Sequence, residues 1–113
     1  MDSSDKFAEV FATLCAKYID RAHSQRERLA ELRGALDAHE TASEVMAELM
    51  WICHSLHGAS GTFGYPEVGV AAADAERLVK RAQTGTVTDE TWRDLDVALQ
   101  QLHQKMGQLP EHA

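Results

Sequence analysis

Apolar residues recur at intervals of three or four along most of the chain, and this spacing is typical of one face of an α-helix. The first apolar stripe predicts a long helix over about residues 5–38. Polar residues interrupt this stripe between His23 and Arg28, which favours a kink or a break near His23. The residues predicted to face the core are Phe7, Val10, Phe11, Leu14, Tyr18, Ala22, Leu29, Leu32 and Leu36.

A second helix is predicted from about Thr41 to Phe63. It begins with Thr-Ala-Ser-Glu, which matches a capping box whose Thr and Glu side chains bond the first free N–H groups of a helix. Gly64 suits the residue that follows a helix end, and Pro66 suits the first turn of the next helix. The core-facing residues are expected to be Val45, Leu49, Ile52, Leu56, Ala59 and Phe63.

Two further helices follow, separated by a loop expected over residues 83–86. The third stripe is rich in alanine, which predicts close approach to a neighbouring helix, and consists of Val68, Ala71, Ala72, Ala75, Leu78, Val79 and Ala82. Thr88 is expected to cap the fourth helix. The fourth stripe consists of Trp92, Leu95, Leu99, Leu102, Met106 and Leu109.

The four stripes together predict the fold class. No segment alternates apolar and polar residues as a half-buried strand would. Short loops between long amphipathic helices place successive helices side by side and antiparallel. We therefore expect an all-α, up-down-up-down four-helix bundle, with residues 1–113 forming a single domain.

Charge and composition narrow the classes of function. The net charge of −7 argues against nucleic acid as the main partner, because phosphate contacts need clustered Lys and Arg. The same charge favours a soluble monomer. No apolar run is long enough for a membrane span or a signal peptide, so a cytoplasmic location is expected. Cys15 and Cys53 are expected to be free thiols.

His54 lies opposite the apolar stripe of the second helix, so its imidazole is expected to point into solvent. A Gly inside a helix costs about 1 kcal/mol relative to Ala, so Gly58 on this outer face indicates room kept for a partner or a phosphate. Gly61 fits that role and the start of the helix C-terminus equally well. The size of Trp51 favours packing against the first helix. The surroundings of His54 on this face are Ala47, Met50, His57, Gly58 and Gly61, with Trp51 at the edge.

The segment 54–64 reads His-Ser-Leu-His-Gly-Ala-Ser-Gly-Thr-Phe-Gly. It resembles the signature of the histidine-containing phosphotransfer (HPt) domain family, His-x-Leu-Lys-Gly followed by small residues and a further Gly. The resemblance implies a phosphoacceptor at His54, phosphate or partner support from His57, Gly58 and Gly61, and a docking face that includes Ala47, Met50 and Trp51. The family Lys is His57 here, and a histidine supports phosphate charge more weakly and only with the right protonation.

The resemblance also implies a function. The chain would be a phosphorelay intermediate, accepting a phosphoryl group on His54 from a receiver-domain aspartate or a hybrid sensor histidine kinase and passing it to a response-regulator aspartate. Mg²⁺ would come from the receiver, and no cofactor or metal of its own is expected. The sequence contains no Gly-x-x-x-x-Gly-Lys-Ser/Thr loop, so ATP-dependent kinase activity of its own is not expected.

Two alternatives remain open. The chain could be an adaptor that binds a receiver or a kinase without carrying phosphate, as the replacement of the family Lys by His57 allows. It could also be a metal-binding bundle that uses His54, His57 and the adjacent Cys53. Metal sites in helical bundles point inward and recruit ligands from several helices, whereas these two histidines are predicted to point outward, so the metal site is the less favoured alternative.

Overall fold

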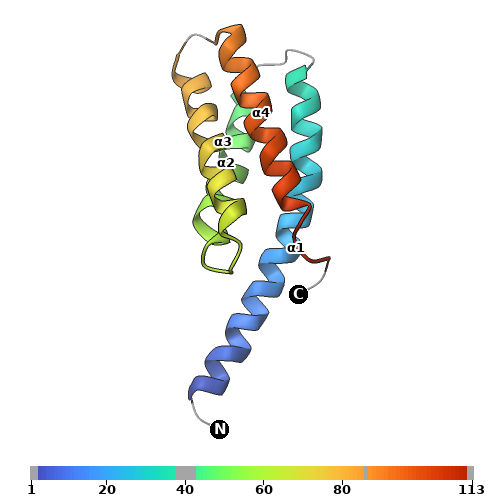
Figure 1. The fold of residues 1–113 in the computed structure, drawn as a ribbon, viewed down its shortest axis with the longest axis vertical. Coiled ribbons are helices and arrows are strands. Elements are labelled where there is room, and N and C mark those ends of the chain that lie inside the picture. Colours follow the sequence, from blue (N-terminus) through green and yellow to red (C-terminus); the bar gives the residue numbers. More distant parts are fainter. Residues whose placement is uncertain (1–2, 38–42, 86, 112–113) are drawn as a thin grey trace.

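The protein forms a bundle of four helices, as the sequence predicts. The structure, a computed structural model, describes residues 3–37, 43–85 and 87–111. Successive helices run in opposite directions, and each packs against two neighbours around one apolar core (Figure 1). Over the described residues there is no strand. The four helices are α1 (Ser3–Asp37), α2 (Ser43–Ser60), α3 (Pro66–Thr84) and α4 (Asp89–Met106).

The core confirms most of the predicted stripes. From α2, α3 and α4 it takes the expected leucines, Ile52, Val68 and Val79, together with Ala72 and Ala75, which lie at 0% exposure. Four buried apolar residues were not in the predicted stripes, and these are Ile19, Met46, Cys53 and Ala98. They widen the buried faces of α1, α2 and α4, because each of these helices packs against two neighbours rather than one.

The first part of α1 departs from the prediction. Phe7, Val10, Phe11 and Leu14 were expected in the core, and all four are exposed. The reason is visible in Figure 1, where the N-terminal part of α1 extends beyond the ends of the other helices. The core begins on α1 only at Tyr18. The apolar stripe is therefore real, but its first third has no neighbouring helix in the described bundle.

The expected kink or break near His23 is not a break, since α1 runs uninterrupted from Ser3 to Asp37. Its polar middle is used for contacts between helices. His23 Nε2 donates to the carbonyl of Pro110 at 2.6 Å, and Arg26 Nε donates to the carbonyl of His103 at 3.1 Å. Arg28 forms an ion pair with Glu48 on α2. These bonds link α1 to the end of α4, to the residues that follow it and to the start of α2.

The turn between α2 and α3 follows from Gly64, whose φ of +90° lies in the region that glycine adopts without strain. The N–H of Tyr65 donates to the carbonyl of Ser60 at 2.8 Å, and the N–H of Gly64 donates to the carbonyl of Gly61 at 3.3 Å. This pair of bonds is a Schellman cap, so the predicted role of Gly64 is confirmed. Regular helix ends at Ser60, three residues earlier than expected, and Gly61 lies in the capping turn.

The remaining helix ends agree with the sequence except for small shifts. Pro66 is the first residue of α3, and the Thr88 hydroxyl accepts from the N–H of Thr91 at 3.1 Å at the start of α4. The loop expected over 83–86 is shorter, because α3 continues through Thr84. The capping box at Thr41 lies outside the described residues. None of the helices in the described ranges is long and apolar enough to span a membrane.

Candidate functional site

His54 and His57 lie on the outer face of α2 and share a single carboxylate on α3. His54 Nδ1 is 2.7 Å from Glu76 Oε1, and His57 Nδ1 is 2.8 Å from Glu76 Oε2. The His54 side chain is 68% exposed and the His57 side chain 53% exposed, whereas Glu76 is 21% exposed. The two imidazoles therefore stand in solvent while the carboxylate that holds them lies partly between the helices.

Close packing of α3 on α2 brings Glu76 within reach of both rings. The fully buried α3 residues just before Glu76 are small, namely Ala72 and Ala75. One turn earlier, a Cβ added at Gly69 would lie 3.5 Å from the Cβ of Ser60, so the two backbones approach closely at the end of α2. The prediction that the alanines of α3 allow close approach is therefore confirmed.

The electrostatics of this cluster fix which nitrogen of each ring carries hydrogen. The hydrogen bond from His54 lowers the pKa of the Glu76 carboxyl, burial raises it by less, and the bond from His57 lowers it again. An ionised carboxylate only accepts hydrogen bonds, so both Nδ1 atoms must donate to it. A neutral imidazole has one N–H, and Nε2 of His54 is then left with a free lone pair on an exposed ring.

The glycines around His54 are not required by packing. A Cβ added at Gly58 or Gly61 would meet no atom within 4 Å, and both residues are exposed. Gly58 lies inside regular helix, where its cost of about 1 kcal/mol relative to Ala is offset by no local contact. The open space beside His54 is therefore a property of the surface itself and leaves room for a close partner.

The other predicted docking residues differ in exposure. Ala47 is exposed, and Met50 is half-buried against the edge of the core. Trp51 was expected to pack against the first helix, but it is 65% exposed. The core beside it is filled by Leu49 and Ile52, which are 0% and 3% exposed, so the indole remains on the surface next to the histidines.

Sequence reasoning missed Glu76 and Gly69, the two α3 residues that complete the site. Glu76 lies 22 residues after His54 and belongs to another helix, so no local spacing connects the two. The available signal was an acidic residue directly after Ala75 in a helix whose small residues face a neighbour. Gly69 carried no signal, because a glycine near a helix start is common.

The metal alternative gains no support from the arrangement. Cys53 is fully buried, and burial raises the pKa of its thiol to about 12, with the nearby Glu76 as a smaller cause. It points away from the exposed histidines and stays protonated at neutral pH. Across residues 3–37, 43–85 and 87–111, no group of three or more His, Cys, Asp or Glu side chains could hold a metal ion. Both cysteines are free thiols, as expected.

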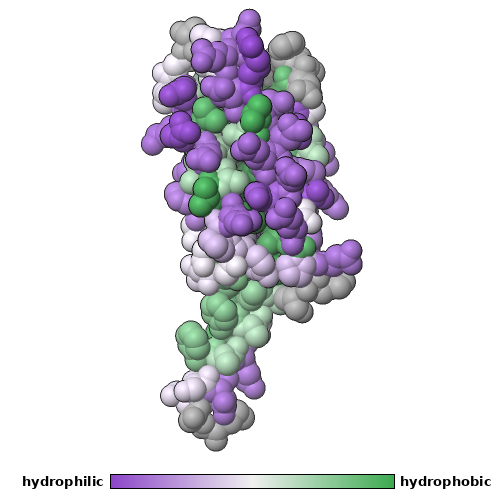
Figure 2. Space-filling model, viewed as in Figure 1, coloured by the Kyte–Doolittle hydropathy of each residue, from purple (hydrophilic) through white to green (hydrophobic). Residues whose placement is uncertain are grey.

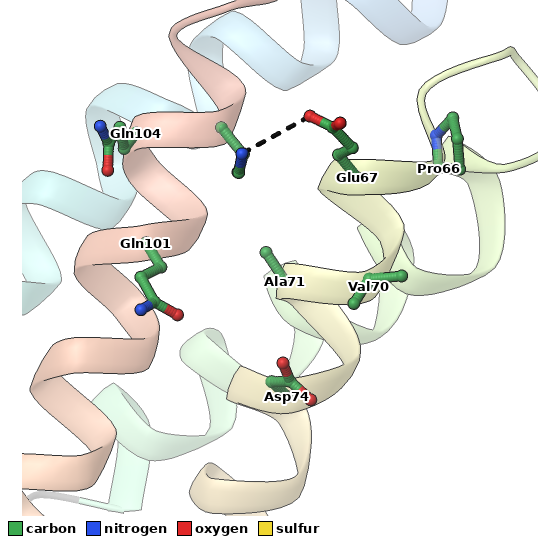
Figure 3. A pocket seen from close by; sticks show the side chains of 8 residues that line it. Pro66, Glu67, Val70, Ala71, Asp74, Gln101 and Gln104 are labelled. Carbon is green, nitrogen blue, oxygen red and sulfur yellow. Dashed lines mark ion pairs between the residues drawn. The ribbon is translucent and has the colours of Figure 1, made fainter.

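A groove of 560 Å³ lies between α3 and α4, away from the histidines. Figure 3 shows Val70, Ala71 and Gln101 on its walls, with an ion pair of 3.5 Å between Lys105 and Glu67 across one end. Neither His54 nor His57 lines this groove. The histidines instead lie on an outward helix face. Another protein can cover such a face, whereas a small molecule could not be enclosed there.

Comparison with known proteins agrees with this geometry. The family model described as Hpt domain matches residues 14–106, which include α2, α3, α4 and all of α1 from Leu14 onward. Comparisons with curated proteins and with solved structures give no match. Hpt domains are phosphotransfer modules without kinase activity that act with receiver domains and kinases. Since the match covers most of the sequence, the chain belongs to the Hpt domain family, whose members carry out histidine phosphotransfer in two-component signalling.

Proposed function

We propose that the protein is a phosphorelay intermediate that accepts a phosphoryl group on Nε2 of His54 from a receiver-domain aspartate and passes it to the aspartate of a response regulator. The observation that carries this proposal is the 2.7 Å bond between His54 Nδ1 and Glu76. It directs the proton to Nδ1 and leaves the exposed Nε2 as the nucleophile. The family match and the open space at Gly58 support the same assignment.

The transfer step follows from this hydrogen bond. The lone pair of His54 Nε2 attacks the phosphorus of the aspartyl phosphate, the Nε2–P bond forms, and the P–O bond to the aspartate breaks. The electron pair of the broken bond leaves with the aspartate carboxylate. The imidazole ring becomes positively charged and keeps its proton on Nδ1, where the Glu76 carboxylate stabilises it. The return step reverses these changes with a second aspartate.

The partner supplies the rest of the chemistry. Mg²⁺ bound by the receiver would offset the charge of the transferred phosphoryl oxygens. This chain contributes a nucleophile held on a rigid helix, so that catalysis is mainly a matter of positioning. We place receiver docking on Ala47, Met50, Trp51, His54, His57, Gly58 and Gly61, and a hybrid sensor histidine kinase would supply the first receiver. A cytoplasmic location remains a prediction from the sequence, and the monomer predicted from the charge is the form we expect at low protein concentration.

His57 takes the position of the family Lys and also donates to Glu76, at 2.8 Å. With Nδ1 bonded to the carboxylate, its Nε2 can donate to a phosphoryl oxygen only when the ring is protonated. Phosphate support from His57 is therefore weaker than that of a lysine at neutral pH. In the adaptor alternative, the protein would bind receivers without carrying phosphate.

The first test is ³¹P NMR of the protein treated with phosphoramidate, beside His54→Gln and His57→Gln. We expect a phosphohistidine signal in the wild type and in His57→Gln, and a loss of at least about 1,000-fold in labelling rate in His54→Gln, because the nucleophile is absent. Circular dichroism of the variants controls for folding. A signal that persists undiminished in His54→Gln would assign the acceptor elsewhere.

The second test uses a panel of receiver domains loaded with acetyl phosphate. Transfer of label from a receiver to the chain, and onward to an unlabelled receiver, is the expected result. A receiver that binds the wild type with no transfer in either direction would contradict the relay and support the adaptor alternative.

A further inference from the structure

The N-terminal part of α1 presents large apolar side chains to solvent. Every residue from 3 to 14 is exposed, and we call this range the projecting segment. The exposed fraction is 71% for Phe7, 53% for Val10 and 46% for Leu14. Figure 2 shows green, apolar surface gathered on the part of α1 that extends beyond the bundle. Contiguous exposed apolar surface on a small protein usually marks a site of association.

The projecting segment is separate from the histidine site. The family match begins at Leu14, so Phe7, Val10 and Phe11 lie outside the part of the chain that Hpt domains share. The histidine cluster is built only from α2 and α3. The apolar segment is therefore a property of this chain, and phosphotransfer does not account for it.

The spacing of the apolar residues suits another helix. Phe7, Phe11 and Leu14 are separated by four and three residues, which is the spacing of a seam along which two helices pack side by side. Phe7 and Phe11 already stack, with ring centroids 6.2 Å apart, so the seam is ordered into one aromatic surface. An apolar seam of this kind is complementary to a copy of itself.

The charge of the projecting segment also favours a second copy. Asp5 and Glu9 against Lys6 give it a net charge of −1, whereas the whole chain carries −7. Two copies that meet at their bundles bring most of that negative charge together, and two copies that meet at the projecting segments do not. We propose that the projecting segment binds the projecting segment of a second copy of the chain, with the two helices antiparallel.

The antiparallel orientation follows from where the bundle lies. The other three helices pack on α1 only from Tyr18 onward, so antiparallel segments place the two bundles at opposite ends of the dimer. Parallel segments would bring the two bundles side by side. Antiparallel helices also align their dipoles favourably. The histidine faces of the two copies remain open, because neither α2 nor α3 takes part in this contact.

The dimer is expected to be weak. A helix of 12 residues is about 18 Å long, and a contact of that length buries less than the roughly 800 Å² per partner of a standard interface. We expect a dissociation constant on the order of 100 µM, so association has to be measured at high protein concentration. Burial of apolar area accounts for the contact, and added salt should not weaken it.

Sedimentation equilibrium from about 10 to 500 µM tests the proposal without any phosphorylation, so its outcome is independent of the proposed function. We expect the mass to rise from 12.5 kDa toward twice that value. The double variant Phe7→Glu with Val10→Glu should stay at the monomer mass throughout. The matched control is Val97→Glu, since Val97 is an exposed valine (51%) on α4, and it should dimerise as the wild type does.

Two results would overturn the proposal. One is a wild type that stays at the monomer mass up to about 500 µM. The other is a Val97→Glu variant that dissociates as fully as the double variant, which would place the contact elsewhere. If the wild type is monomeric and the double variant binds acetyl-phosphate-loaded receivers at least tenfold more weakly, the segment contacts a receiver and the second-copy proposal is wrong.

Discussion

Two surfaces of this protein expose apolar or uncharged groups, and they are built in opposite ways. The face of α2 around His54 keeps open space beside the histidine at Gly58 and Gly61, with the large Trp51 only at its edge. The projecting segment of α1 displays large side chains such as Phe7 and Val10. The first surface lets a partner approach a reacting atom, while the second offers area to be buried. Short-lived contact suits the first, and association that excludes water suits the second.

The two surfaces also differ in how the fold supports them. The histidines depend on a second helix, because Glu76 on α3 holds both rings. The projecting segment depends on no other helix of the described bundle before Tyr18, apart from the ring of Phe63, whose centroid is 5.6 Å from that of Phe11. Changes inside the bundle should therefore reach the histidine face and leave the projecting segment nearly unaffected.

The largest expected effect compares one substitution at two places on α1. Leu29→Ala should lower the free energy of unfolding by about 2–5 kcal/mol, because Leu29 is fully buried and its loss leaves a cavity. Leu14→Ala should lower it by less than about 1 kcal/mol, because Leu14 is 46% exposed. Urea unfolding at low protein concentration measures both. Equal losses would mean that the projecting segment is part of the folding core.

The next largest effect concerns the carboxylate. Glu76→Gln keeps the size of the side chain but removes the charge, and its amide no longer forces the proton onto Nδ1 of His54. We expect labelling by phosphoramidate to slow about 10- to 100-fold, by analogy with the loss of a carboxylate that orients a metal-ligating histidine. Melting temperature is the control for folding. A wild-type labelling rate would show that the rings do not need Glu76.

Two substitutions at Gly58 distinguish an effect on the stability of the protein from an effect on receiver docking. Gly58→Ala should raise the free energy of unfolding by about 0.5–1 kcal/mol, because glycine inside a helix is destabilising. Gly58→Leu should lower phosphoryl transfer from a receiver at least tenfold by filling the space beside His54, while labelling by phosphoramidate stays unchanged. Gly34→Leu is the matched control, since Gly34 is exposed on α1 and a Cβ there meets no atom within 4 Å. Loss of phosphoryl transfer in Gly34→Leu as well would show that the effect of Gly58→Leu is not local to His54.

The smallest expected effect is the pH dependence of stability. The folded-state pKa of Glu76 is lowered by its bond to His54, so its contribution is present above the unfolded value of about 4.3 and is lost as pH falls through the folded value. Urea unfolding between about pH 5 and 3 should show a slightly shallower loss of stability in Glu76→Gln than in the wild type, by less than about 1 kcal/mol. If Glu76→Gln and the wild type lost stability equally between about pH 5 and 3, the pKa of Glu76 would not be lowered in the folded state.

The sequence predicted the parts of the fold that depend on local rules. The stripes of α3 and α4, the cap at Thr88 and the turn at Gly64 are each decided within a few residues. The exposure of Phe7 and Leu14 could not be predicted in this way. Periodicity shows that a helix has an apolar face, but the lengths of the neighbouring helices decide how much of that face is covered.

The candidate site shows the same division. The outward position of His54 follows from its angle to the apolar stripe of α2, and the sequence predicts it. The contact with Glu76 depends on how α3 is placed along α2, which is set by close approach at Gly69 and Ser60. The size of Trp51 favoured packing against the first helix, although the sequence also placed it at the edge of the docking face; its burial is decided by the space left beside Leu49 and Ile52.

The exposure of Trp51 has an optical consequence. The chain contains two tryptophans, and the other one, Trp92, is half-buried against the core. A soluble quencher such as acrylamide should reach Trp51 freely and Trp92 poorly. Covering the histidine face would shield Trp51 alone, whereas unfolding would expose Trp92. Tryptophan fluorescence of the unlabelled protein can therefore distinguish receiver docking from unfolding in a single experiment.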